Sequence, residues 1–172
     1  MRFIIFLFFV TSVFAQADFR NSNWGDTKAQ VKKNIKEKPR TEEVNRLSYS
    51  DLIMTYDVDT WYEFNHEGKL YSGGYVFSIE HSLPDLYFDD YDKVKENITK
   101  KYGDGNEKNI WKNDMYKDSP GVALMLGHVK KLCAWKTPKT TIILILSGDN
   151  YKASLGLLYQ STEIKNEEKS EF

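Results

Sequence analysis

The chain has 172 residues, of which 24 are basic and 25 acidic, so its formal net charge at pH 7 is −1. This near balance argues against a nucleic-acid-binding protein, because such proteins neutralise phosphates with a basic face. Four tryptophans, eleven tyrosines and ten phenylalanines supply ample apolar material, whereas the single cysteine, Cys133, excludes a disulfide within the chain.

Residues 1–17 have the pattern of an export signal. Arg2 gives a positive start, residues 3–10 are apolar, and Ala15-Gln16-Ala17 has the small residues of a cleavage site. The apolar run is well short of the roughly 20 residues that a bilayer-spanning helix needs, so no permanent membrane anchor is expected. We therefore expect cleavage after Ala15 or Ala17 and a soluble protein in the periplasm or outside the cell.

The first half of the remaining chain is predicted to form a helix followed by antiparallel strands. Thr27 and Gln30 have the spacing of a capping box, and Pro39 ends the helix by residue 38. Residues 47–79 are rich in β-branched and aromatic side chains and contain a hairpin with its turn at residues 65–69. Apolar and polar residues alternate in this hairpin, which is typical of a sheet with one covered face.

The second half repeats this order of elements. Residues 88–102 predict a helix that is capped by Asp89 or Asp90 and stops at Gly103. Residues 104–119 predict a loop with one short strand, and residues 121–128 fit either a short helix or a strand. A strand at residues 132–136 precedes a second hairpin with strands at 140–146 and 151–160 and a turn at 147–150. Because residues 142–146 are all apolar, their strand is expected to be central and covered on both faces.

The expected fold class is therefore α+β, with a mostly antiparallel sheet and helices on one face. We interpret residues 18–82 and 83–162 as two tandem repeats, each a helix followed by antiparallel strands. Together they are expected to form a single domain over residues 18–162. The charged residues 163–172 are expected to form a flexible tail.

Scattered positions resemble a motif of small exported bacterial proteins, written F-x4-W-G-x-[ST]-x2-[EQ]-V. The matching residues are Phe19, Trp24-Gly25, Thr27 and Gln30-Val31, then Tyr91-x2-Val94 with Lys101-Tyr102-Gly103, and Trp135-x-Thr137 with Thr140, Thr141 and Ile143. This resemblance implies the tandem α+β fold of the β-lactamase-inhibitor-protein and outer-membrane-assembly lipoprotein superfamily. It implies no catalytic residue, and the chain lacks the acylated cysteine of the lipoprotein members.

The residues that carry chemistry form no recognisable catalytic or metal-binding motif. His66, His81 and His128 lack the paired spacing of metal ligands and are interpreted as surface or capping residues. Cys133 would be a candidate nucleophile if a histidine lay beside it, but its apolar neighbours favour a buried strand position. The aspartates of residues 85–92 lack the calcium-loop pattern and are interpreted as caps or turns. We therefore predict no catalytic residue, cofactor or metal.

The leading functional hypothesis is a non-enzymatic protein-binding or envelope-assembly module whose partner is another envelope or secreted protein. Tyrosine and tryptophan dominate the binding energy of many interfaces, and the candidate surface aromatics are Tyr49, Tyr56, Trp111 and Tyr116. The alternative is a hydrolase or small-ligand carrier whose site is assembled from distant residues. An exposed Cys133 beside a histidine would favour the alternative, and a contiguous exposed apolar patch would favour binding. The sequence leaves the oligomeric state open.

Overall fold

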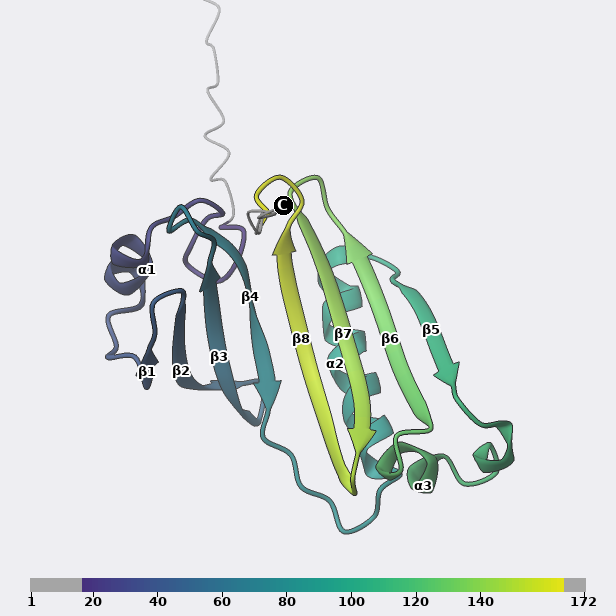
Figure 1. Cartoon of the computed structure of the whole chain (residues 1–172). Coiled ribbons are helices and arrows are strands. Elements are labelled where there is room, and N and C mark those ends of the chain that lie inside the picture. The colour runs from purple at the N-terminus through teal and green to yellow at the C-terminus, as the bar shows by residue number, and fades with distance from the viewer. Residues whose placement is uncertain (1–16, 166–172) are drawn as a thin grey trace, which may run out of the picture.

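A computed structural model describes residues 17–165 of the chain. The predicted export signal, apart from Ala17, and the end of the predicted tail lie outside these residues. The elements in chain order (Figure 1) are α1 (Lys28–Ile35), β1 (Thr41–Glu42), β2 (Arg46–Ile53), β3 (Tyr56–Phe64), β4 (Leu70–Phe77), α2 (Leu86–Tyr102), β5 (Asn106–Trp111), the 3-10 helix η1 (Asp114–Tyr116), α3 (Pro120–Met125), β6 (Val129–Lys136), β7 (Thr140–Asp149) and β8 (Lys152–Ser161). No helix within residues 17–165 has the length and hydrophobicity to span a membrane.

The eight strands form one antiparallel sheet in the order β1-β2-β3-β4-β8-β7-β6-β5. Strands from the first half of the chain therefore lie together on one side, and strands from the second half lie on the other (Figure 1). The last strands of the two halves, β4 and β8, pair at the centre from Ser72↔Gln160 to Phe77↔Leu155. The predicted α+β class and the antiparallel sheet are confirmed.

The helix ends follow local chemistry, with one correction. The predicted capping box of α1 is present, because Thr27 accepts from the backbone N–H of Gln30 and the Gln30 side chain accepts from that of Thr27. The predicted capping of α2 by Asp89 or Asp90 is wrong, since the helix begins at Leu86 and its N-cap residue is Asp85. Asp90 lies inside the helix, where its carboxylate binds side chains of other segments instead of capping the helix.

The second half resolves the alternatives that the sequence left open. Residues 104–119 contain the strand β5, and residues 120–125 form the helix α3. The turn of the second hairpin lies at Asn150 and Tyr151, later than predicted, and both residues have positive φ, 47° and 63°. A two-residue turn with two left-handed residues matches the twist of its flanking strands, so β7 extends to Asp149.

One face of the sheet packs on α2 and forms the core. In β7 the side chains of Ile142, Leu144 and Leu146 are fully buried on this covered face. Helix α2 contacts β7 and β8 and lies behind them in Figure 1, with Tyr91 and Val94 buried in the same core. Burial of such side chains stabilises the fold by about 1.5–3 kcal/mol each relative to exposure.

The N-terminal segment joins the two halves across this core. The Phe19 ring lies 5.1 Å from the ring of Tyr62 in β3 and 5.2 Å from that of Tyr159 in β8, measured between centroids. Trp24 stacks on Phe19 and donates its indole N–H to the Thr140 hydroxyl at 2.9 Å. The two halves therefore share one hydrophobic core.

The prediction that β7 is covered on both faces is wrong, because the face of the sheet opposite α2 is not covered at its centre by residues 17–165. This strand is central, as predicted, but Ile143 and Ile145 are only half-buried on the side away from α2. Figure 1 shows no helix of the described residues over the centre of this side. The strand is apolar throughout because both of its faces carry apolar side chains, although only one face is covered.

Candidate partner-binding face

The side of the sheet opposite α2, which we call the open face, has an apolar centre. Strand register places residues of β3, β4, β6, β7 and β8 side by side there: Ala134↔Ile143, Ile143↔Leu158, Leu158↔Gly74 and Gly74↔Trp61 form one row, and Leu132↔Ile145, Ile145↔Gly156 and Gly156↔Val76 form the next. Most of these side chains are half-buried, and Val76 is 42% exposed. The centre of the open face is thus contiguous and apolar.

Trp61 is the large aromatic side chain at the apolar centre of the open face. An added Cβ at Gly74 would lie 2.9 Å from the Trp61 ring, so the indole lies against the backbone of β4. The Arg46 guanidinium lies 4.8 Å from the centroid of this ring. Glycine at position 74 therefore lets the indole lie along the sheet, and the apolar centre stays accessible.

One side of the open face carries unpaired positive charge. Lys130 and Lys136 of β6 and Lys108 of β5, which we call the basic strip, are exposed and occupy the open-face positions of their strands. Within residues 17–165 no carboxylate oxygen lies within 4.0 Å of their ammonium groups. These lysines are therefore exposed and have no carboxylate partner among the described residues.

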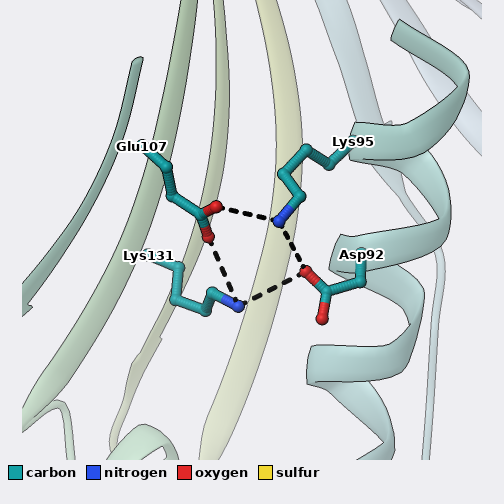
Figure 2. Close-up of polar contacts among 4 residues, drawn as sticks. All are labelled: Asp92, Lys95, Glu107 and Lys131. Atoms are coloured by element: carbon teal, nitrogen blue, oxygen red, sulfur yellow. Dashed lines mark hydrogen bonds and ion pairs between the residues drawn. The ribbon is translucent and has the colours of Figure 1, made fainter. Parts of the chain in front are cut away.

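The only acidic residue of β5, Glu107, faces the other way because successive strand residues point to opposite sides. Figure 2 shows Glu107 on the α2 side, where it binds Lys95 at 2.8 Å and Lys131 at 3.6 Å. Asp92 of α2 completes this network by contacting the same two lysines. Hydrogen bonds to Glu107 and Asp92 raise the pKa of Lys95 against the opposing effect of its burial. The network connects β5 and β6 to α2, and it directs the carboxylate of Glu107 away from the basic strip.

The other side of the open face is nearly neutral. β3 carries Asp57, Asp59 and Glu63 on this side, as its alternation with the core residues requires. Asp59 forms an ion pair with Arg40, and Glu63 lies opposite Arg46 in the strand register. The open face therefore has a charge asymmetry, with its positive charge concentrated over β5 and β6.

None of the four predicted partner-binding aromatics lies on the open face. Tyr49 is 3% exposed, so its predicted surface position is wrong. Tyr56 is half-buried and donates its hydroxyl to Asp90 at 2.7 Å. Trp111 lines a cavity with Phe88 on the α2 side, and Tyr116 stacks on His128 with 4.6 Å between ring centroids. The aromatic side chain at the apolar centre of the open face is Trp61, which strand alternation identifies because its neighbours Thr60 and Tyr62 are buried.

The predicted burial of Cys133 is confirmed. Its side chain is 2% exposed, and its residue lies opposite Leu144 of β7. Burial raises the pKa of the Cys133 thiol, and the nearby charge of Glu107 raises it further. A nucleophilic cysteine needs access and a lowered pKa, so this position does not support the hydrolase hypothesis.

A second cluster surrounds His81, which the sequence did not distinguish from a surface histidine. The imidazole Nε2 of His81 contacts one carboxylate oxygen of Asp90, and Tyr56 donates to the other. Hydrogen bonds from His81 and Tyr56 hold the pKa of Asp90 below its ordinary value, although burial of the carboxyl acts against them. This contact anchors the connection between β4 and α2, beside a cavity of about 620 Å³.

The described residues contain no group of three or more histidine, cysteine or acidic side chains placed to hold a metal ion. Comparisons of the chain with protein-family models, curated proteins and solved structures gave no match.

Proposed function

We propose that this chain is a non-enzymatic protein-binding module that docks another exported protein on its open face. The apolar centre of the open face is the observation that carries this proposal, because five strands contribute to it and no helix of the described residues lies over it. Contiguous apolar patches above a few hundred Å² on soluble proteins commonly mark interaction sites. A rigid sheet also loses little conformational entropy on binding, which favours affinity.

Export and a repeated architecture complete the proposal. The pattern of residues 1–17 supports export, cleavage after Ala15 or Ala17, and a periplasmic or extracellular partner. The strand order supports two tandem repeats, residues 18–82 and 83–162, because in each half a helix precedes a run of antiparallel strands. Val31 of α1 and Val94 of α2 belong to the same core, which supports helices on one face. Both features fit the resemblance to the β-lactamase-inhibitor-protein superfamily, whose motif residues include Trp24 and Thr27.

Site-specific photo-crosslinking in the producing cells tests the proposed function. A photoreactive residue at Ile145 or Leu158 is expected to form a covalent adduct with a partner protein, because both positions lie in the apolar centre. The same residue at Glu96, which is exposed on α2, serves as the control. Absence of protein adducts from both open-face positions, or equal adducts from Glu96, would contradict the proposal.

A charged substitution in the apolar centre is the second part of the crosslinking experiment. Ile145→Lys is expected to abolish the Leu158 adduct by placing an unpaired charge in the interface. Thermal unfolding of the purified variant verifies that it remains folded, since Ile145 is only half-buried. A folded Ile145→Lys variant that keeps the full Leu158 adduct would argue against docking at the open face.

A further inference from the structure

The basic strip opposes binding at the open face, because a bound partner would remove its ammonium groups from water. Its three ammonium groups flank the apolar centre: Lys108 lies opposite Leu132 in the register, and Lys130 and Lys136 lie on the same strand as Leu132. Removing an ammonium group from water without a partner costs several kcal/mol. A protein that covers the open face must therefore supply negative charge here or leave this side uncovered.

A concavity at one end of the basic strip offers room for such a group. It has a volume of about 410 Å³ and is lined by Lys112, Lys130, Ile110, Ser147 and Asp149 among others. Asp149 is its one acidic residue, yet its carboxylate lies more than 4.0 Å from the ammonium of either lysine. Two lysines with an apolar wall suit a carboxylate on a short aliphatic stem.

The carboxylates on β3 are too few for a second copy of this chain to be the favoured partner of the open face. A two-fold axis parallel to the strands and over β8, the middle strand of the apolar centre, would place β3 of one copy over β6 of the other. Of the three carboxylates on β3, Asp59 already pairs with Arg40 and Glu63 lies opposite Arg46. Only Asp57 remains for three lysines, so self-association would leave most of the basic strip unpaired.

We infer that the partner is a different protein whose contact surface carries an apolar segment flanked by carboxylates, and that these carboxylates bind the basic strip and the neighbouring concavity. This inference rests on the proposed function and specifies the chemistry of the partner. Charge pairs of this kind raise the association rate and set the orientation of the complex more than they raise affinity. The orientation follows: the acidic flank of the partner lies over β5 and β6, and its apolar segment lies over β4, β7 and β8.

A random twelve-residue peptide display library, selected against the full folded chain, tests the inference and does not require the natural partner to be identified first. Peptides whose capture is lost with Leu158→Lys bind the open face and are retained. We expect these peptides to combine apolar residues with aspartate or glutamate. Lys130→Glu/Lys136→Glu is expected to reduce their affinity about tenfold or more, with a larger loss at low salt than at high salt.

The matched control is Lys33→Glu/Lys38→Glu, which makes the same change in net charge on exposed lysines outside the sheet. It is expected to change the affinity by less than about twofold. Open-face peptides without acidic residues, or equal losses with both double variants, would overturn the inference and leave the proposed function intact. Failure to select any peptide sensitive to Leu158→Lys would count against the proposed function itself.

Two further measurements test whether the open face instead binds a second copy of this chain or a lipid surface. Sedimentation analysis of the chain would reveal a dimer, and a dimer abolished by Leu158→Lys would replace the different partner with a second copy. Flotation with vesicles of anionic phosphatidylglycerol tests a lipid surface, and binding lost with Lys130→Glu/Lys136→Glu would overturn the inference in favour of a membrane. We expect a monomer that does not float with the vesicles.

Discussion

At the scale of single residues, glycines determine how closely the layers of this protein approach each other. An added Cβ at Gly73 would lie 2.5 Å from the Phe19 ring, on the covered face at the centre of the sheet. An added Cβ at Gly156, on the open face, would lie no closer than 3.6 Å to the Tyr75 carbonyl oxygen. Two glycines in adjoining strands therefore have opposite tolerance for a methyl group.

We expect Gly73→Ala to lower the free energy of unfolding by about 1–3 kcal/mol, because the methyl group must displace a fully packed aromatic ring. Gly156→Ala is the control and should be neutral or stabilising by up to about 1 kcal/mol, since alanine restricts the unfolded chain without a clash. Urea unfolding followed by tyrosine and tryptophan fluorescence measures both. Equal stability of the two variants would refute the close approach of Phe19 to the sheet.

At the scale of elements, the network in Figure 2 fastens α2 to β5 and β6. Lys131 is its most buried member, with a side chain that is 15% exposed, and its ammonium lies 4.6 Å from the centroid of the Tyr91 ring. Because of its cation–π contact and partial burial, this lysine contributes more to the free energy of unfolding than an ordinary surface ion pair does. Lys100, paired with Glu96 at 2.8 Å on the outer side of α2, is such an ordinary case.

We expect Lys131→Met to lower the free energy of unfolding by about 0.5–1.5 kcal/mol, after allowing for the solvent that screens Asp92 and Glu107. Lys100→Met should change it by less than about 0.5 kcal/mol. Urea unfolding at low and high salt measures both, and the difference between them should shrink as salt screens the charges. A Lys100→Met loss as large as that of Lys131→Met would contradict this assignment.

Local pattern predicted most elements but not their assembly. The capping box of Thr27 and Gln30 and the alternation in β3 involve residues close in sequence, and both predictions were correct in kind. The pairing of β4 with β8 joins Phe77 to Leu155, and no local periodicity encodes a contact over that separation. The open face could not be predicted for the same reason, because the apolar run of β7 does not reveal which side α2 covers. Asp90 was misread as a cap because its partners His81 and Tyr56 lie on other elements.

At the scale of the whole molecule, buried tyrosines link stability to alkaline pH. Burial raises the pKa of Tyr62 to about 12, and it raises the pKa of Tyr75 and Tyr159 as well. An unfolded tyrosine ionises near pH 10, so the unfolded chain loses these protons at lower pH than the folded protein. The stabilisation is therefore complete below about pH 10 and is lost as pH rises from about 10 to about 12.

We expect the free energy of unfolding to fall in this window by up to about 1.4 kcal/mol per pH unit for each such tyrosine. Tyr62→Phe should make the fall less steep. Urea unfolding at several alkaline pH values measures the slope, and tyrosinate absorbance should increase together with the loss of structure. Ionisation of all tyrosines near pH 10 in a chain that keeps its near-ultraviolet circular dichroism would disprove the link.

The central position of β8 also has a consequence for how the molecule is made. Strands β1 to β4 leave the ribosome early, but the inner edge of β4 can pair only after residues 155–160 have been synthesised. An unpaired strand edge is a template for intermolecular association. During that interval the nascent chain needs a chaperone, or transport in an unfolded state, to prevent this edge from pairing with a neighbouring molecule.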